Sequence, residues 1–204
     1  MTNTSPDTHK VTPVLLAELE TLITPKWSLE ELGQFLRLIR PGSRPLSIAL
    51  DMPNGYHSSA SSFRGPPGLS IAKFLVSTNA LTICITGSYH YWQVAFLVKM
   101  APRARVLVLN KLDLGNTKPE KYTAVKETRH GPHLDDLYVV DTMISQSFLL
   151  WLIKVYHVRR LTITNDSKVT QGSDTIGKEQ IYADISHLGC NFKSITSDEP
   201  YPMK

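Results

Sequence analysis

The stretch that most constrains this chain is a short apolar run that ends on an acid. Leu46 to Leu50 is mostly apolar and lies between Pro45 and Pro53, which predicts a buried strand. Asp51 follows directly, and Asn54 comes three residues later in a turn. A charge at the end of a buried strand is costly unless something pairs with it. Such an acid either belongs to a ligand site at the sheet edge or only caps the next loop.

Strand-like and helix-like patterns alternate along the rest of the chain. Further strands are expected at Leu81–Thr86, Arg105–Leu109, Arg160–Thr164 and Asn191–Thr196. Helices are expected at Leu69–Val76, Tyr91–Met100, Asp136–Tyr156 and Gly177–Leu188. This alternation argues for an α/β fold, in which a central, mostly parallel five-stranded sheet lies between two helical layers. Right-handed crossovers would bring the carboxyl ends of all its strands to one edge.

The N-terminal part differs in composition from the rest. A polar, disordered N-terminus, a helical pair, a main domain and a tail are expected at residues 1–12, 13–45, 46–197 and 198–204. The helical pair is inferred from apolar residues at helical spacing and from a capping box formed by Ser28 and Glu31. It would serve as packing material or as a docking surface for a protein partner.

Composition narrows the class of protein. The 204 residues, 42% of them apolar, suffice for one folded domain. A formal net charge of +4 permits an acidic partner without requiring one. Cys84 and Cys190 are the two cysteines, which fits a reducing compartment and provides no zinc site. No apolar run reaches membrane-spanning length and the N-terminus has no signal core, so we expect no membrane association and an intracellular location, cytoplasmic or nuclear.

Several acids are expected at the same sheet edge as Asp51. Asp135 and Asp136 would open the long helix, Asp141 would project from it, and Asp166 follows the fourth strand. Converging carboxylates repel each other unless a hard cation neutralises them, and Mg²⁺ or Mn²⁺ is the expected choice. A water bound to such a metal is a nucleophile for phosphodiester cleavage. Any one of these acids alone is better explained as a helix cap, and only their coincidence favours a metal site.

Together these residues resemble the NYN branch of PIN-like nucleases, and Regnase-type ribonucleases are the closest comparison. The matching segments are Asp51-x-x-Asn54, Phe63-Arg64-Gly65, Asp135-Asp136 with Asp141, and Thr164-Asn165-Asp166. The resemblance spans about residues 46–197 and rests on short motifs. It implies a three-layer PIN-like fold, a bound Mg²⁺ or Mn²⁺, and cleavage of single-stranded RNA by a metal-bound water.

The resemblance also assigns roles to residues. It implies catalytic roles for Asp51, Asn54, Asp136, Asp141 and Asp166, and metal ligation by Asp51, Asp135, Asp136, Asp141 and Asp166. Lys168 and Thr170 stand where the family often has a further Asp. That departure favours a rival, a catalytically inactive NYN-like module that binds RNA or a protein partner. A second rival is a Rossmann-like small-molecule enzyme. The sequence lacks the glycine-rich turn that such an enzyme has after its first strand.

Basic residues concentrate from Lys99 to Arg129, where eight basic and three acidic side chains give a local charge of +5. This segment is either a phosphate-tracking strip or a solvated loop. Tyr89 is the better candidate for stacking on a base, whereas Trp92 is expected in the core. The predicted RNA contacts are Arg64, Tyr89, Arg103, Lys111, Lys118, Lys126 and Arg129.

Overall fold

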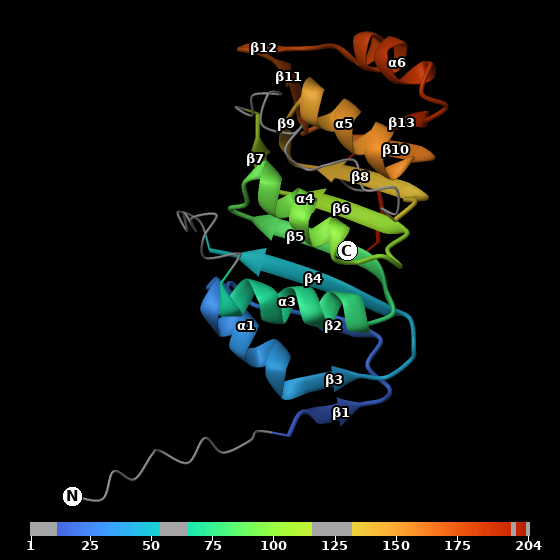
Figure 1. Ribbon diagram of the computed structural model, residues 1–204. Helices are drawn as coiled ribbons and strands as arrows, with labels where there is room; N and C mark the ends of the chain where they lie inside the picture. Colours follow the sequence, from blue (N-terminus) through green and yellow to red (C-terminus); the bar gives the residue numbers. More distant parts are fainter. Residues whose placement is uncertain (1–11, 54–64, 116–131, 197–198, 203–204) are drawn as a thin grey trace, which may run out of the picture.

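The computed structural model describes residues 12–53, 65–115, 132–196 and 199–202. Its centre is a seven-stranded sheet in which all neighbouring strands are parallel. The strands are β2 (Thr21–Ile23), β4 (Leu46–Met52), β5 (Ala80–Gly87), β6 (Val106–Asn110), β8 (Asp136–Val140), β10 (Arg160–Thr164) and β13 (Asn191–Ile195). Their order across the sheet is their order along the chain (Figure 1). Each strand with its connection is therefore stacked on the unit before it, as in an α/β solenoid.

The helices within the described ranges lie on one face of this sheet (Figure 1). They are α1 (Leu29–Leu38), α3 (Pro66–Ser77), α4 (Tyr91–Lys99), α5 (Gln146–Tyr156) and α6 (Lys178–Ser186). One hydrophobic cluster joins their buried residues to Leu50, Ile85, Leu109, Val139 and Ile163 of the strands. Right-handed crossovers that always advance in one direction place every connection on the same face. The α/β class and the parallel sheet are confirmed, while the second helical layer is not found among the described residues.

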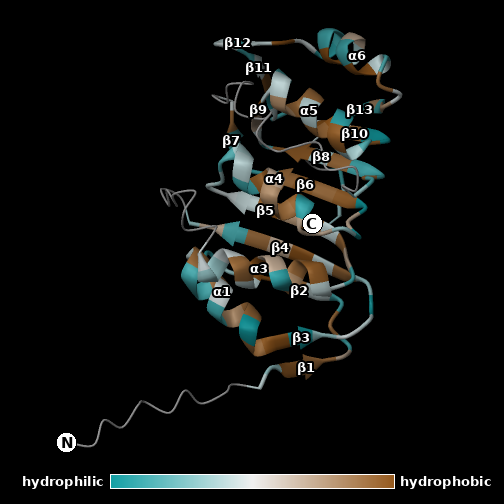
Figure 2. Ribbon diagram, in the orientation of Figure 1, coloured by the Kyte–Doolittle hydropathy of each residue, from teal (hydrophilic) through white to brown (hydrophobic). Residues whose placement is uncertain are grey.

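The side chains of β4 show the alternation that this arrangement requires. In β4 the residues from Leu46 to Met52 alternate between buried and half-buried, and the buried set faces the helices. Figure 2 shows hydrophobic residues concentrated in β4, β6 and β8. No helix in the described ranges is long and apolar enough to cross a membrane.

A second, smaller sheet follows the carboxyl ends of the main strands. It contains β7 (Asp113–Leu114), β9 (Met143–Ser145), β11 (Lys168–Gln171) and β12 (Asp174–Thr175), in the order β12-β11-β9-β7. The chain turns into β7 and β9 through Lys111 and Asp141, both in the left-handed region with φ of 54° and 44°. Successive units are therefore joined twice, once by the main sheet and once by this small sheet.

Two hydroxyl groups tie these turns together. Oγ1 of Thr142 lies 2.7 Å from the carbonyl oxygen of Val140 and accepts the backbone N–H of Leu112 at 3.2 Å. Oγ of Ser167 accepts the backbone N–H of Thr142 at 3.2 Å and donates to the carbonyl oxygen of Val139 at 3.0 Å. Since Thr142 is buried, these bonds satisfy backbone groups that water cannot reach.

The N-terminal helical pair predicted for residues 13–45 is half wrong. The capping box of Ser28 and Glu31 does start α1, but the preceding apolar residues form β1 (Val14–Leu16) and β2 instead of a helix. β1 pairs with β3 (Ile39–Pro41), and β2 extends the main sheet beside β4. Three-residue strands are too short to show a period, so tertiary pairing decided between strand and helix.

The long helix predicted over Asp136–Tyr156 is also wrong. This segment forms β8, then β9, and only then α5, whose first turn is capped when Ser145 Oγ accepts the backbone N–H of Phe148. The left-handed turn at Asp141 interrupts the apolar run. A continuous apolar run does not by itself distinguish a buried strand from a buried helix. With β2 and β8 added, the predicted five-stranded sheet has seven strands.

Candidate functional site

The face of the main sheet opposite the helices is the candidate site. Its outer row, at the carboxyl edge, pairs Asp51 with Thr86, Thr86 with Asn110, and Asn110 with Val140 across neighbouring strands. The next row inward contains Ala49, Cys84, Val108, Tyr138, Thr162 and Lys193. The cluster of buried apolar residues on this side, Cys84, Val108 and Val140, contains no helical residue. We call this side the uncovered face.

Two buried oxygens on the outer row have no donor in the described part of the chain. They are Oδ1 of Asp51 and Oδ1 of Asn110, which stand on either side of Thr86. The Nδ2 group of Asn110 donates to Oγ1 of Thr86 at 3.5 Å. Burial raises the pKa of Asp51, and the positive charges of Lys26 and Lys111 oppose that rise. An unsatisfied buried acceptor costs roughly 1–3 kcal/mol, so a donor from outside would be favoured here.

The segment from Glu199 to Pro202 lies against the same face. Glu199 forms an ion pair with Lys193, with 3.1 Å between Oε2 and Nζ. Tyr201 packs on the cluster of Cys84, Val108 and Val140. A cavity of about 290 Å³ remains between this segment and strands β8, β10 and β13. Its lining includes Asp136, Tyr138, Arg160, Lys193, Glu199 and Pro200. The uncovered face therefore accommodates a non-helical segment with an aromatic side chain.

The predicted acid pair lies at the opposite edge of the sheet. Asp136 is the first residue of β8 and pairs in register with Arg160, the first residue of β10. Its carboxylate accepts hydrogen bonds from Nε and Nη2 of Arg160 at 2.6 and 2.7 Å. Asp135 forms an ion pair with Arg159 at 3.2 Å. Because β8 is a strand and not a helix, these acids stand at its amino end, a strand length away from Asp51.

The other predicted acids reach the correct edge but stand several strands away from Asp51. Asp141 and Asp166 are exposed residues in the turns that follow β8 and β10. Two strands, β5 and β6, separate β4 from β8. At about 4.8 Å between strands, Asp51 and Asp141 stand on backbones roughly 14 Å apart, whereas a metal ion binds its ligands within about 2.6 Å.

The described residues therefore do not fit the expected Mg²⁺ or Mn²⁺ site. Asp51 is the single carboxylate on the outer row, and its neighbours there are Thr86 and Asn110. Among the described residues, no group of three or more His, Cys, Asp or Glu could hold a metal ion. Asn54 lies outside the described residues, so its expected role beside Asp51 stays a prediction.

The predicted RNA contacts that lie within the described residues do not form one surface. Tyr89 is 4% exposed and lies in the core, so it cannot stack on a base. Burial and the negative charge of Asp51 both raise the pKa of its phenol. Trp92 packs against the core as expected. Arg103 precedes β6 and Lys111 follows it, at opposite edges of the sheet. The remaining predicted contacts, Arg64, Lys118, Lys126 and Arg129, lie outside the described residues.

Sequence reasoning missed Thr86 and Asn110 as a pair, although a signal was present. Residues that pair across neighbouring strands are separated by similar lengths of chain. The separation is 24 residues from Ile85 to Leu109, 30 from Leu109 to Val139, and 24 from Val139 to Ile163. Intervals of 20 to 50 residues between similar apolar strands indicate a solenoid. No family model, curated protein or solved structure matches this chain.

Proposed function

We propose that this chain is a non-catalytic binding module that holds an extended protein segment on its uncovered face. The observation that carries the proposal is the pair of buried acceptor oxygens, Asp51 Oδ1 and Asn110 Oδ1, for which the described chain provides no donor. A Lys or Arg side chain of a partner would supply N–H donors to both. It would also neutralise the partly buried charge of Asp51, which burial alone disfavours.

The electrostatics of this face favour a protein over RNA. Its charged residues in the described strands are Asp51, Asp136, Arg160 and Lys193, two acids and two bases, and the charges of Lys26 and Lys111 act on Asp51 from outside the strands. A nucleic-acid surface needs an excess of positive charge along the backbone path. Asp51 would repel a phosphate at the very point where the unsatisfied acceptors lie. A cationic side chain of a protein partner experiences the opposite force.

The solenoid arrangement supports the same proposal. Stacked repeats present a long, regular sheet face that other proteins of this architecture use for binding. The segment from Glu199 to Pro202 already lies there, anchored by Tyr201 on an apolar patch and by Glu199 on Lys193. The aromatic residue of a partner segment would pack on the apolar patch as Tyr201 does. A cationic side chain next to it would donate to the unsatisfied oxygens of Asp51 and Asn110.

The metal-dependent ribonuclease stays a prediction that rests on the sequence resemblance. It requires one ion to reach Asp51, Asp166 and one acid from Asp135, Asp136 or Asp141. The described geometry gives this requirement less support than it gives binding, because the acids lie on different edges or several strands apart.

The test is selection of partners from a displayed library of random peptides on the immobilised wild-type chain. We expect the selected peptides to share Lys or Arg beside an aromatic residue. The double variant Asp51→Ala/Asn110→Ala should bind them at least about tenfold more weakly, because one or two charge-assisted hydrogen bonds are lost. A matched control, Asp174→Ala/Glu179→Ala, removes exposed residues of β12 and α6 and should bind as the wild type does.

Three results would contradict the proposal. The selected peptides could bind the Asp51→Ala/Asn110→Ala chain as tightly as the wild type. They could lack any common cationic residue. Alternatively, the wild-type chain could cleave labelled single-stranded RNA with Mn²⁺ while an Asp51→Asn chain does not, which would establish the nuclease instead.

A further inference from the structure

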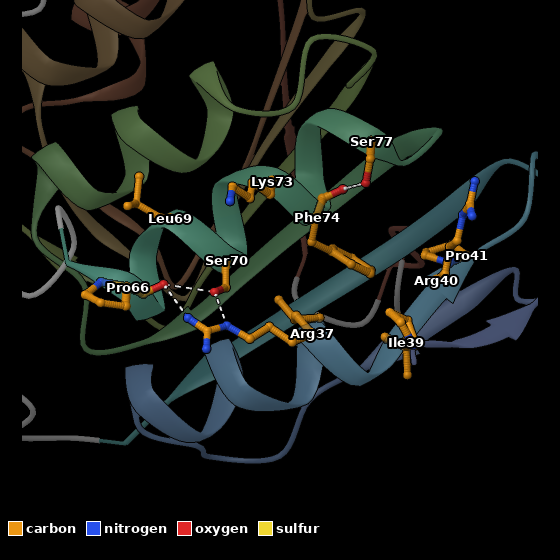
Figure 3. A pocket seen from close by; sticks show the side chains of 12 residues that line it. Arg37, Ile39, Arg40, Pro41, Pro66, Leu69, Ser70, Lys73, Phe74 and Ser77 are labelled. Carbon is orange, nitrogen blue, oxygen red and sulfur yellow. Dashed lines mark hydrogen bonds between the residues drawn. The ribbon is translucent and has the colours of Figure 1, made fainter. Parts of the chain in front are cut away.

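The helix side of the protein carries a second hollow, unconnected with the uncovered face. It has a volume of about 720 Å³ and lies between α1, β3 and α3 (Figure 3). Leu36 and Phe74 are buried residues of its lining, Ile39 is half-buried, and Leu69 is 52% exposed. We call this hollow the α1/α3 groove. An apolar lining with an exposed leucine is the kind of surface that partners cover.

α1 and α3 pack closely against each other where α1 carries Gly33. A Cβ added at Gly33 of α1 would lie 2.7 Å from Cα of Pro67, in the first turn of α3. One turn further along α1 is Arg37, which has a long side chain where Gly33 has only a hydrogen atom. The helices therefore approach each other at Gly33 and leave a hollow beyond it.

One wall of the groove is held by hydrogen bonds. Figure 3 shows Arg37 reaching from α1 to the start of α3, where its Nε donates to Oγ of Ser70 at 2.7 Å. Its Nη2 donates to the carbonyl oxygen of Pro66 at 3.4 Å, and Ser70 Oγ donates to the same oxygen at 2.9 Å. This network holds the side chains of Arg37 and Ser70 in place, so a partner would not have to order them on binding.

The charged side chains in the described lining of the groove are all basic. Arg37, Arg40 and Lys73 line the groove, and no Asp or Glu of the described chain does so. Arg40 and Lys73 are exposed, and neither forms an ion pair with another described residue. An apolar hollow rimmed by exposed cations is complementary to an amphipathic segment that carries acids beside its apolar residues.

We propose that the α1/α3 groove binds an acidic amphipathic helix of a protein partner. Leucine or phenylalanine side chains of that helix would enter between Leu36, Leu69 and Phe74, as in other helix-in-groove complexes. Its Asp and Glu side chains would pair with Arg40 and Lys73. The chain's own residues 1–11 do not have this character, since they contain one acid, Asp7, beside Lys10.

Other anionic partners fit less well. RNA binding of this kind uses exposed aromatic rings to stack bases, and the aromatic residue of the groove, Phe74, is 5% exposed. A membrane surface is flat, whereas the apolar residues here line a hollow. A helix with acids on both sides of an apolar stripe meets the shape and the charge together.

The experiment measures fluorescence anisotropy of a labelled peptide of about 15 residues, long enough for four helical turns. The peptide has Leu residues at helical spacing flanked by Glu, and its twin has Gln in place of each Glu. We expect the wild-type chain to bind the Glu peptide at least about tenfold more tightly than the Gln peptide, with affinity falling as salt rises. Arg40→Glu/Lys73→Glu should remove that preference.

A matched control keeps the charge change and moves it elsewhere. Arg103→Glu/Lys154→Glu alters the net charge equally at two exposed residues outside the groove and should leave binding within about twofold of the wild type. Leu69→Ser tests the apolar part and should weaken binding by about threefold to tenfold, because the exposed leucine surface no longer becomes buried. Thermal unfolding of each variant verifies that it is folded.

The proposal is overturned by any of three results. The Glu and Gln peptides could bind equally. The control pair of charge reversals could weaken binding as much as the groove pair does. Phosphatidylserine vesicles or labelled RNA could bind in a manner that depends on Arg40 and Lys73 while the Glu peptide does not bind. None of these results bears on Asp51 and Asn110, so the two proposals succeed or fail separately.

Discussion

Gly87 at the end of β5 lies directly against Met52 in β4, beside the candidate site. A Cβ added at Gly87 would stand 2.0 Å from the carbonyl oxygen of Met52, and the φ of Gly87 is +99°. Sheet register pairs the same two residues. Any side chain at position 87 would overlap with Met52 and would strain the backbone. The outer row of the uncovered face therefore depends on glycine at this position.

Gly87→Ala should destabilise the fold severely, by roughly 2–4 kcal/mol, since neither the backbone oxygen nor the backbone conformation can easily change. Urea unfolding followed by circular dichroism measures the loss. Gly172→Ala is the control, because Gly172 also has positive φ, +66°, but nothing lies within 4 Å of an added Cβ. It should cost only about 1 kcal/mol. Equal losses in the two variants would contradict the close approach to Met52.

Asp51→Asn should change how stability depends on pH. Burial raises the pKa of Asp51 above its ordinary value of 3.8, so the folded chain binds this proton more tightly than the unfolded chain does. The residue's contribution to stability is therefore fully present below the unfolded pKa and is lost as pH rises through the folded pKa. The side chain in Asp51→Asn does not titrate, so this variant does not lose stability in this way as pH rises.

Urea unfolding between about pH 4 and pH 7 compares the two chains. The stability of Asp51→Asn relative to the wild type should rise across this range, so that the variant is the more stable chain at neutral pH. Asp174→Asn, at an exposed position of β12, serves as the control. The idea fails if the difference between wild type and Asp51→Asn is the same at every pH.

Thr142→Val should weaken the joint between neighbouring solenoid units. The substitution keeps the shape but removes the hydroxyl that accepts the Leu112 N–H and lies against the Val140 carbonyl, leaving a buried donor unsatisfied at a cost of about 1–3 kcal/mol. Thr162→Val, on the uncovered face, should cost less than about 0.5 kcal/mol. Chemical denaturation of both variants provides the comparison, and a neutral Thr142→Val would show that the hydroxyl is dispensable.

Tyr201→Ala should make Cys84 reactive. Cys84 is 4% exposed, and Tyr201 packs on its cluster. Burial also raises the pKa of this thiol. In a Cys190→Ser background, labelling of Cys84 by a disulfide reagent should become at least about fivefold faster without the tyrosine, since exposure increases the fraction of accessible thiolate. Unchanged labelling would mean that Tyr201 does not shield Cys84 in solution. Tyr182→Ala, at an exposed residue of α6, is the control.

Local patterns along the chain determined much of this fold. The apolar run Leu46–Leu50, the capping box at Ser28, and the strand at Arg160–Thr164 were all predicted where the structure has them. Each is a property of a few neighbouring residues: apolar continuity between prolines, a side chain that satisfies a free backbone N–H, or a short β-branched run. The alternation of strands with helices likewise determined the α/β class.

Long-range strand pairing determines which of these residues meet. The segment Asp136–Val140 is a strand because it is inserted between β6 and β10, and its first residue pairs with Arg160. Asp135 and Asp136 were thereby moved to the opposite edge from Asp51. The unsatisfied oxygens of Asp51 and Asn110 come together through register across β5, over 59 residues of chain. Local sequence preferences determine the elements, whereas long-range backbone pairing determines their order, and a site on a sheet edge depends on that order.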